Sequence, residues 1–330
     1  MSAINAVLTT VSYQIEGVRE LRQIFEEAEF IRLDNRDEAG IARALKRVDV
    51  AVLAGDLDGR YLDAPNLRWI HCDHAGLNRS AVPELFERDD LVVTGSAGRN
   101  AAALAQHAMF FALALAYEAP RLIHSQEQHR WNSLADYSDG LCLWGKTLGI
   151  VGYGNTGKAL ARLAKAFGMR VIAYGRHPED AEPEIVDQYR DAADEGGLGG
   201  LLTASDFVVL TIRMTDDTYH LIGERELNMM KSSAYLINLA RGSVVDEQAL
   251  GSALAHEVIK GAGLDVFEQE PLPQGAPIWD APHTIFTSHT TLRLPDATSR
   301  SLAIIRENRR RFLAGEPMLN ALRLSDVYSH

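Results

Sequence analysis

The sequence predicts an α/β protein built from two doubly wound parallel sheets, and three observations support this fold class. Short apolar runs alternate with amphipathic stretches, as in strands joined by helical crossovers. The alternation occurs twice, once in the first hundred residues and again from Lys146 onward. The 330 residues suffice for about two domains at roughly 100–200 residues each. A composition of 46% hydrophobic and 24% charged residues is that of a globular protein.

Five apolar runs in the first series predict the strands of one sheet. Between the first two runs, Val18, Leu21, Ile24 and Phe25 recur at the spacing of a buried helix face. Because strand and helix alternate, we expect crossover connections and a parallel sheet. The expected strands are 6–8, 30–33, 50–53, 67–70 and 91–93.

The second series predicts a larger sheet, followed by a helix over about 295–312 that returns the chain to the first domain. The apolar window 101–117 is interrupted by Gln106 and His107, and we expect a buried helix at a domain or subunit interface. The glycine-rich stretch 195–200 lacks a following Lys-Ser/Thr pair, so we expect a surface turn there. The expected strands are 147–151, 170–174, 207–211, 234–238, 261–265 and 284–287.

The charge and cysteine content exclude several classes of protein. The formal net charge is −12, from 33 Lys+Arg against 45 Asp+Glu, which disfavours a nucleic-acid partner. Cys72 and Cys142 are far apart and in no metal-ligand spacing, so we expect no metal site and a reducing compartment. The first ten residues show no export signal, and no apolar stretch reaches the length of a membrane span. We therefore expect a cytoplasmic protein without a membrane partner.

The strongest single motif is Gly152-Tyr153-Gly154-Asn155-Thr156-Gly157, which follows an apolar strand and begins a helix. In this context Gly152 permits the tight turn, Gly154 allows a pyrophosphate to approach the backbone, and Gly157 allows helix and strand to pack closely. The free amides of the first helical turn, at Asn155 and Thr156, meet the phosphate charge together with the helix dipole. The motif predicts a dinucleotide site.

The end of the second strand of that series predicts which dinucleotide binds. An acidic residue there would bond the ribose 2′-hydroxyl of NAD, but Gly175 occupies the position and is followed by Arg176 and His177. A guanidinium pairs well with a 2′-phosphate, and the histidine can assist. We expect a preference for NADP(H), with NAD(H) possible. The alternative is that Arg176 stacks on the adenine or faces solvent.

Three further segments place polar side chains just past predicted strands. Arg241 follows one strand, Glu268 and Glu270 follow the next, and His289 follows the last. In an open parallel sheet, ligands bind outside the carboxyl ends of the strands. All three segments are therefore expected at the crevice that holds the cofactor.

With these motifs in this order, the chain resembles the D-isomer-specific 2-hydroxyacid dehydrogenase family. The resemblance spans nearly the whole length and is densest from Leu148 to His289. It implies a Rossmann nucleotide domain over 102–292, inserted into a flavodoxin-like substrate domain formed by 1–101 and 293–330. It also implies a homodimer built around the nucleotide domain.

The resemblance assigns the catalytic roles to Arg241, Glu270 and His289, and it selects Glu270 rather than Glu268. The chemistry of these residue types agrees. A guanidinium can clamp the carboxylate of a 2-oxo acid and polarise its carbonyl. An imidazole can protonate the carbonyl oxygen as hydride reaches the carbon, and a neighbouring carboxylate stabilises the protonated ring and orients it. Arg241 and His289 are therefore also expected to bind the small anionic substrate.

Other positions match parts of the family that bind the cofactor or the substrate. The loop from Asp73 to Leu77 matches the one whose amides hold the substrate carboxylate, with Ala75 and Gly76 as the matched contacts. Asp73 and His74 either reach the substrate or hydrogen-bond within the loop. Asp265 matches a position beside the nicotinamide. Segments that line the cofactor through their backbone include Ile212, Leu239 and Ala240.

Departures from the family pattern lie near the expected pocket. Thr211 and Arg213 stand where histidine and proline are common, and Ser288 replaces a frequent proline. The segment 290–293 replaces small residues after the histidine, and Arg293 offers a contact to a second anionic group. These changes leave the reaction class intact but open the choice of substrate.

The sequence thus predicts a reductase of small 2-oxo acids, similar to glyoxylate or hydroxypyruvate reductases, that forms D-2-hydroxy acids. One alternative is an NAD-dependent enzyme similar to phosphoglycerate dehydrogenase. The other is a non-catalytic, nucleotide-sensing protein similar to the corepressors of the same family.

Overall fold

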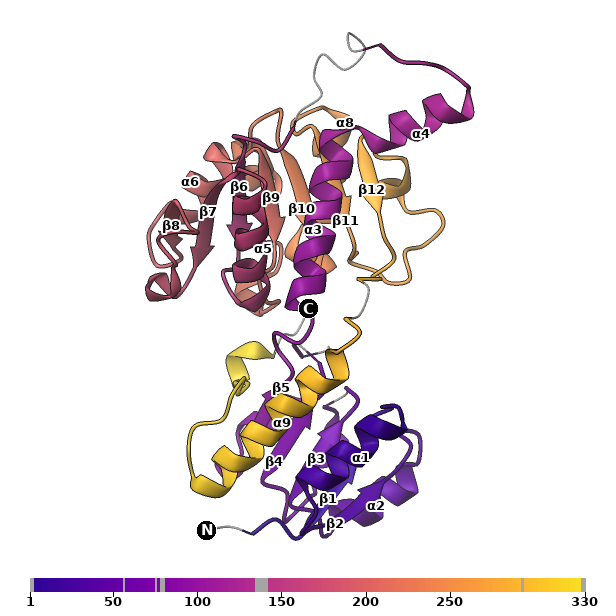
Figure 1. The fold of residues 1–330 in the computed structure, drawn as a ribbon, viewed down its shortest axis with the longest axis vertical. Coiled ribbons are helices and arrows are strands. Elements are labelled where there is room, and N and C mark those ends of the chain that lie inside the picture. Colours follow the sequence, from indigo (N-terminus) through magenta and orange to yellow (C-terminus); the bar gives the residue numbers. More distant parts are fainter. Residues whose placement is uncertain are drawn as a thin grey trace. The chain divides into compact units, whose positions relative to one another are not determined.

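The computed structural model describes residues 3–55, 57–74, 76–77, 81–133, 142–291 and 294–327. The chain divides into two compact units (Figure 1). Unit 1 comprises residues 1–100 and 293–330, and unit 2 comprises residues 101–292. Each unit contains one parallel sheet, so the predicted α/β class with two doubly wound sheets is confirmed.

Unit 1 is built on a five-stranded sheet with the order β2-β1-β3-β4-β5. This order is that of the flavodoxin-like doubly wound fold. Three of its helices are α1 (Ile15–Ile24), α2 (Glu38–Leu45) and α9 (Ala297–Ala314). The strands are β1 (Ala6–Thr9), β2 (Glu29–Arg32), β3 (Val50–Leu53), β4 (Trp69–Cys72) and β5 (Val92–Gly95).

The two faces of this sheet bury two separate apolar clusters, because successive strand residues point to opposite sides. Leu8 lies in the cluster that α2 covers, whereas its neighbour Val7 lies in the cluster that α1 and α9 cover. Helices α1 and α9 lie together (Figure 1), although some 280 residues separate paired side chains such as Glu20 and Arg306. The C-terminal helix thus completes the fold of the N-terminal sheet.

Unit 2 is built on a seven-stranded sheet with the order β12-β11-β10-β9-β6-β7-β8. Counted from the first strand of the unit, the order follows that of the dinucleotide-binding fold with one strand added at the edge. Its helices are α3 (Ala101–Ala116), α4 (Ala119–Glu127), α5 (Asn155–Ala166), α6 (Gly197–Ala204), α7 (Glu224–Met229) and α8 (Glu247–Ala255). The strands are β6 (Thr147–Val151), β7 (Arg170–Gly175), β8 (Gln188–Asp191), β9 (Phe207–Leu210), β10 (Tyr235–Asn238), β11 (Gly261–Leu264) and β12 (Thr284–Phe286).

Helices cover both faces of the larger sheet. Helices α3 and α5 lie side by side on one face (Figure 1), where Phe111 and Leu160 join the apolar core. Helix α6 lies on the other face, because a Cβ at Gly149 of β6 would come within 2.5 Å of Leu201. Loops follow the carboxyl ends of β6, β9, β10 and β11, where ligands bind in such sheets.

Two local expectations were wrong. The sequence predicted six strands for this sheet, and β8 adds a seventh, which the apolar pattern missed because its sequence is Gln-Tyr-Arg-Asp. The stretch 195–200 was expected to be a surface turn, but Gly197 already begins α6. Leu201 and Leu202 are buried there, so tertiary packing overrides the low helix propensity of glycine.

No single helix in the described ranges is long and apolar enough to cross a membrane. Helices α3 and α4 meet the criterion only as a pair, and that pair is bent by 60°. In α3, Ala105, Phe111 and Ala112 are fully buried.

A buried chain of hydrogen bonds crosses β4 and β5 and fixes the protonation of His71. Ser96 donates to Asp73 over 3.0 Å, so its oxygen must accept from His71 Nε2, also at 3.0 Å. His71 Nδ1 then accepts from Thr94, 2.9 Å away, and Thr94 accepts from Trp69 Nε1. Burial lowers the pKa of His71 from 6.5 to about 4, which agrees with a neutral ring.

This burial predicts acid sensitivity of the fold. Between pH 6.5 and about pH 4, the unfolded chain protonates His71 and the folded chain does not, so stability falls as the pH falls. The shift corresponds to a loss of about 3 kcal/mol across that range. Urea unfolding at pH 7 and pH 4 should show a smaller pH effect in His71→Gln than in the wild type. Equal pH effects in both proteins would contradict the assignment.

Candidate active site

The glycine loop after β6 is shaped by two close backbone contacts. Gly152 has φ +99°, and a Cβ there would lie 2.6 Å from the backbone of Ile212. A Cβ at Gly157 would lie 2.4 Å from the carbonyl oxygen of Gly152. The first glycine therefore lets the strand turn sharply, and the last lets α5 begin directly against it.

Gly154 differs from Gly152 and Gly157, because a Cβ at this position would meet no atom within 4 Å. It caps α5 without a side-chain hydrogen bond, so the amides of Asn155 and Thr156 are presented at the start of the helix. This is open space bordered by backbone donors and the positive end of a helix dipole. The loop fits a nucleotide pyrophosphate.

The end of β7 has no room for an ordinary side chain at Gly175. A Cβ there would lie 2.6 Å from the hydroxyl of Tyr189, which β8 supplies. Arg176 and His177 follow and are exposed, and His177 Nδ1 lies 3.2 Å from Glu179. The unpredicted strand β8 therefore shapes the position at which the sequence suggested cofactor choice.

The remaining cofactor positions follow the ends of three adjacent strands. Ile212 follows β9 and is half-buried, and Leu239 and Ala240 follow β10 and are buried. Asp265 follows β11 and is 2% exposed. Because β9 pairs with β6, these residues lie at the same edge of the sheet as the glycine loop.

Arg241 is held in a short turn after β10 by a buried asparagine. Asn238 accepts from the amide of Ala240 and donates to the carbonyl of Arg241, each over 3.0 Å. The Arg241 guanidinium donates to the carbonyl of Ala240, and within the described ranges it forms no ion pair. Its charge is therefore left for an anion. Asn238 was not singled out from the sequence, although an asparagine at the end of a strand is a common turn signal.

Gly242 brings this turn against the loop after β11. A Cβ at Gly242 would lie 1.9 Å from the carbonyl carbon of Phe267, so only glycine allows the approach. Phe267 in turn donates its amide to Glu270 Oε1 over 3.0 Å. The loop that carries Arg241 and the loop that carries Glu270 are thereby in backbone contact.

Glu270 and His289 form a direct pair. The Nδ1 atom of His289 lies 2.7 Å from Oε2 of Glu270, and the imidazole is 51% exposed. The backbone of His289 is left-handed, with φ +51°, and its amide donates to the carbonyl of Asp265 over 2.7 Å. With Nδ1 bound to the carboxylate, Nε2 is the ring atom available for proton transfer.

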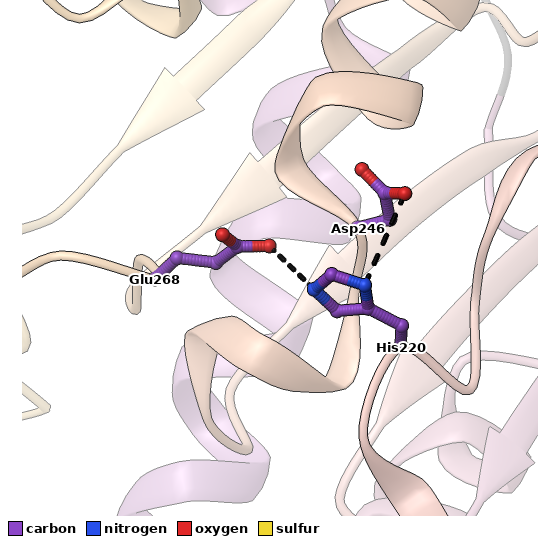
Figure 2. Close-up of side chains that lie close together, drawn as sticks. All are labelled: His220, Asp246 and Glu268. Atoms are coloured by element: carbon purple, nitrogen blue, oxygen red, sulfur yellow. Dashed lines mark hydrogen bonds and ion pairs between the residues drawn. The ribbon is translucent and has the colours of Figure 1, made fainter. Parts of the chain in front are cut away.

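The neighbouring glutamate lies in a different cluster. Glu268 Oε1 is 2.8 Å from Nε2 of His220, and Asp246 Oδ2 is 3.9 Å from Nδ1 of the same ring (Figure 2). Within the described ranges these three residues are the set of side chains whose types and spacing suit a metal ion. Each ring nitrogen faces a different carboxylate, however, and a metal ion uses one of them. The geometry is that of a histidine that joins three loops by contacts to two carboxylates.

The substrate loop predicted in unit 1 is described in part. Asp73 pairs with Arg99 and accepts from Ser96 and Ser301, so it hydrogen-bonds within its unit. Gly76 is half-buried. Ala75 and Arg293 lie outside the described residues.

The comparisons with known proteins agree on one family. Residues 109–291 match the sequence model of the D-isomer specific 2-hydroxyacid dehydrogenase, NAD binding domain. A glyoxylate reductase of Thermococcus gammatolerans is 38% identical over 276 residues, covering 80% of each chain. A glyoxylate reductase of Korarchaeum cryptofilum is 36% identical over 277 residues, covering 81% of this chain and 80% of that protein.

A solved structure is similar over nearly the whole length. It is a D-isomer specific 2-hydroxyacid dehydrogenase from Xanthobacter autotrophicus Py2 in complex with NADPH and MES. It superposes with a TM-score of 0.81 and 28% identity, covering 98% of this chain and 99% of that one.

Because the space at Gly154 is open, a substitution there should weaken nucleotide binding without preventing folding. Gly154→Ala should fold normally, because its Cβ meets nothing, yet the methyl group should occupy the space of the pyrophosphate. We expect the dissociation constant of NADPH, measured by fluorescence titration, to rise at least about 10-fold, or about 1.4 kcal/mol. The melting temperature should fall by only a few degrees, because alanine caps a helix less well than glycine. Gly251→Ala, equally open but inside α8, is the control: it should leave the dissociation constant unaltered, and it should raise the melting temperature slightly because alanine favours a helix interior.

Proposed function

Because the chain belongs to the D-isomer specific 2-hydroxyacid dehydrogenase family, we propose that it reduces small 2-oxo acids such as glyoxylate or hydroxypyruvate with NADPH, forming D-2-hydroxy acids. The family makes it an oxidoreductase that uses a nicotinamide nucleotide. The observation that carries the proposal is the Glu270–His289 pair, at the sheet edge that also presents Arg241. The glyoxylate reductases at 36% and 38% identity support the choice of substrate.

The three side chains have separate tasks in this proposal. The bound reduced nicotinamide supplies the hydride that reaches the 2-oxo carbon. Arg241 binds the substrate carboxylate and polarises the adjacent carbonyl. His289 gives the proton on Nε2 to the carbonyl oxygen, and Glu270 holds Nδ1 and stabilises the charged ring before transfer. Oxidation of the hydroxy acid runs these transfers in reverse. A substrate contact through Gly76 stays a prediction from the resemblance.

The preference for NADPH rests on the end of β7. Tyr189 fills the space beside Gly175, so no carboxylate side chain stands there to bond a ribose 2′-hydroxyl. Arg176 is exposed and can pair with a 2′-phosphate, with His177 beside it. The related Xanthobacter enzyme was solved with NADPH, which supports the proposal.

A homodimer through unit 2 is also proposed. Helices α3 and α4 and the residues after them expose large apolar side chains, among them Phe110 (51%), Ile123 (58%) and Trp131 (95%). Trp131 and Leu122 border a hollow along α4. Apolar patches of this kind mark protein interfaces. Light scattering during size exclusion should give twice the mass of one chain, and the mass of one chain would contradict the proposal.

The cytoplasm is the compartment we propose. Cys72 and Cys142 are both free thiols, which suits reducing conditions. Recovery of the native protein in a fraction other than the cytoplasm would contradict this.

Turnover of 2-oxo acids is the first test. The purified protein should oxidise NADPH in the presence of glyoxylate, hydroxypyruvate, pyruvate or phenylpyruvate. His289→Ala should lower kcat by about 100-fold to 10,000-fold, because a general acid is lost. Glu270→Gln should lower kcat less, since the ring is still present. His256→Ala, an exposed histidine at the end of α8, is the control. Tight nucleotide binding without turnover of any acid would instead favour the nucleotide-sensing alternative.

Cofactor choice is tested at Arg176. Arg176→Ala should raise the KM for NADPH by about 10-fold to 100-fold, because a charge-assisted hydrogen bond to the 2′-phosphate is lost. The KM for NADH should stay the same. Arg162→Ala removes an exposed arginine that pairs with Glu182, and it should change neither value. Equal use of NADH and NADPH by the wild type would overturn the preference.

A further inference from the structure

Four side chains of unit 2 close a hydrogen-bonded ring behind the Glu270–His289 pair. His107, on α3, lies 2.7 Å from Thr291 Oγ1 through Nδ1 and 3.2 Å from Thr287 Oγ1 through Nε2. Thr287 donates to Asp265 Oδ1 over 2.6 Å, and Thr291 is placed to donate to Asp265 Oδ2 over 3.1 Å. The His107 side chain is 11% exposed and that of Asp265 is 2% exposed, so the ring is largely shielded from water.

The count of protons places a proton on Nε2 of His107. Thr287 gives its single proton to the carboxylate, so its oxygen accepts from His107 Nε2–H. The hydroxyl of Thr291 has one proton for two neighbours, Nδ1 of His107 at 2.7 Å and Oδ2 of Asp265 at 3.1 Å, so a neutral imidazole satisfies only one of these two contacts. Burial lowers the pKa of His107, and the nearby Asp265 only partly offsets this effect. The proton on Nε2 is the one that the contacts require.

The ring surrounds the segment that carries His289. Thr287 and Thr291 flank this residue by two positions on either side, and the amides of His289 and Thr290 also bond to Asp265, through its carbonyl and its carboxylate. His289 sits in a left-handed conformation that a non-glycine residue adopts only when its surroundings hold it there. His107 thus connects the loop to the rigid helix α3, which packs in the core and places Phe111 against the same imidazole.

We propose that His107 is a positioning residue for His289, whose two ring nitrogens hold Thr287 and Thr291 around Asp265. The inference rests on the proposed function, because the orientation of His289 matters for proton transfer. Proton transfer requires the Nε2 atom of His289 at a defined place, and small displacements of a reacting group lower the rate strongly.

The first experiment compares variants that keep the volume of the ring. His107→Phe retains stacking on Phe111 but removes both hydrogen bonds, and we expect kcat to fall about 10-fold to 100-fold. His107→Asn should recover part of the loss, because its carboxamide oxygen can accept from Thr291. Thr284→Val, on β12 but outside the ring, is the matched control and should retain kcat. An unchanged kcat in His107→Phe would overturn the proposal.

A double-mutant cycle tests whether His107 acts through the ring. If His107 and Thr291 support the same loop, His107→Phe combined with Thr291→Val should lose no more activity than the worse single variant. Two losses that multiply would show that the residues act independently, which contradicts the proposal.

A measurement without turnover separates this inference from the proposed function. In protein with 15N-labelled histidine, the spectrum at pH 7 should show His107 with a proton on Nε2, identified by its absence in His107→Phe. The signals of His289, identified with His289→Ala, should shift in His107→Phe and stay in place in Thr284→Val. Unshifted His289 signals, or a His107 ring without a proton on Nε2, would overturn the positioning role. Absence of wild-type turnover with these shifts present would overturn the proposed function alone.

Discussion

The parallel pairing of β6, β9, β10 and β11 determines where the chemistry of this chain can occur. Parallel strands end at one edge, and the loops that follow them lie together there. The glycine loop, Arg241 and Asp265 reach this edge from different strands, separated by many residues in sequence. Gly242 then lets two of the loops touch through their backbones, because any larger residue would collide with Phe267. Such backbone contacts fix the positions of side chains that loops carry.

Those contacts matter because the proposed catalytic groups are themselves exposed. His289 and Glu270 have side chains that are 51% and 35% exposed, so burial does little to orient them. The buried polar residues behind them hold them instead: Asn238 holds the turn of Arg241, and Asp265 holds the segment of His289. A buried carboxylate is costly unless its oxygens are hydrogen-bonded, and Asp265 accepts from Thr287 and Thr290 at Oδ1 and from Thr291 at Oδ2. The same hydrogen bonds therefore offset the cost of burying Asp265 and fix the conformation of the loop.

The sequence predicted the parts of the fold in which apolar pattern and burial coincide. Strands such as β3 and β9 are buried along their whole length and read as continuous apolar runs. Strand β8 was missed because it lies at the edge of its sheet and needs no such run. The glycine loop was found because its chemistry is local. His107 was read only as an interruption of an apolar helix, since its partner Thr291 is 184 positions away. Pairings of that kind come from the topology, not from local spacing.

Thr291 departs from the family pattern, and the structure provides hydrogen-bond partners for its hydroxyl. Small residues are common after the histidine in this family, and a threonine adds a hydroxyl that must be satisfied where water is largely excluded. Here it meets both His107 and Asp265. The hydroxyl therefore faces the interior of unit 2, and its effect on the reaction is exerted through the loop of His289. Thr290 follows the histidine directly and has an exposed side chain, so of the two it is the residue that remains free to influence the choice of 2-oxo acid.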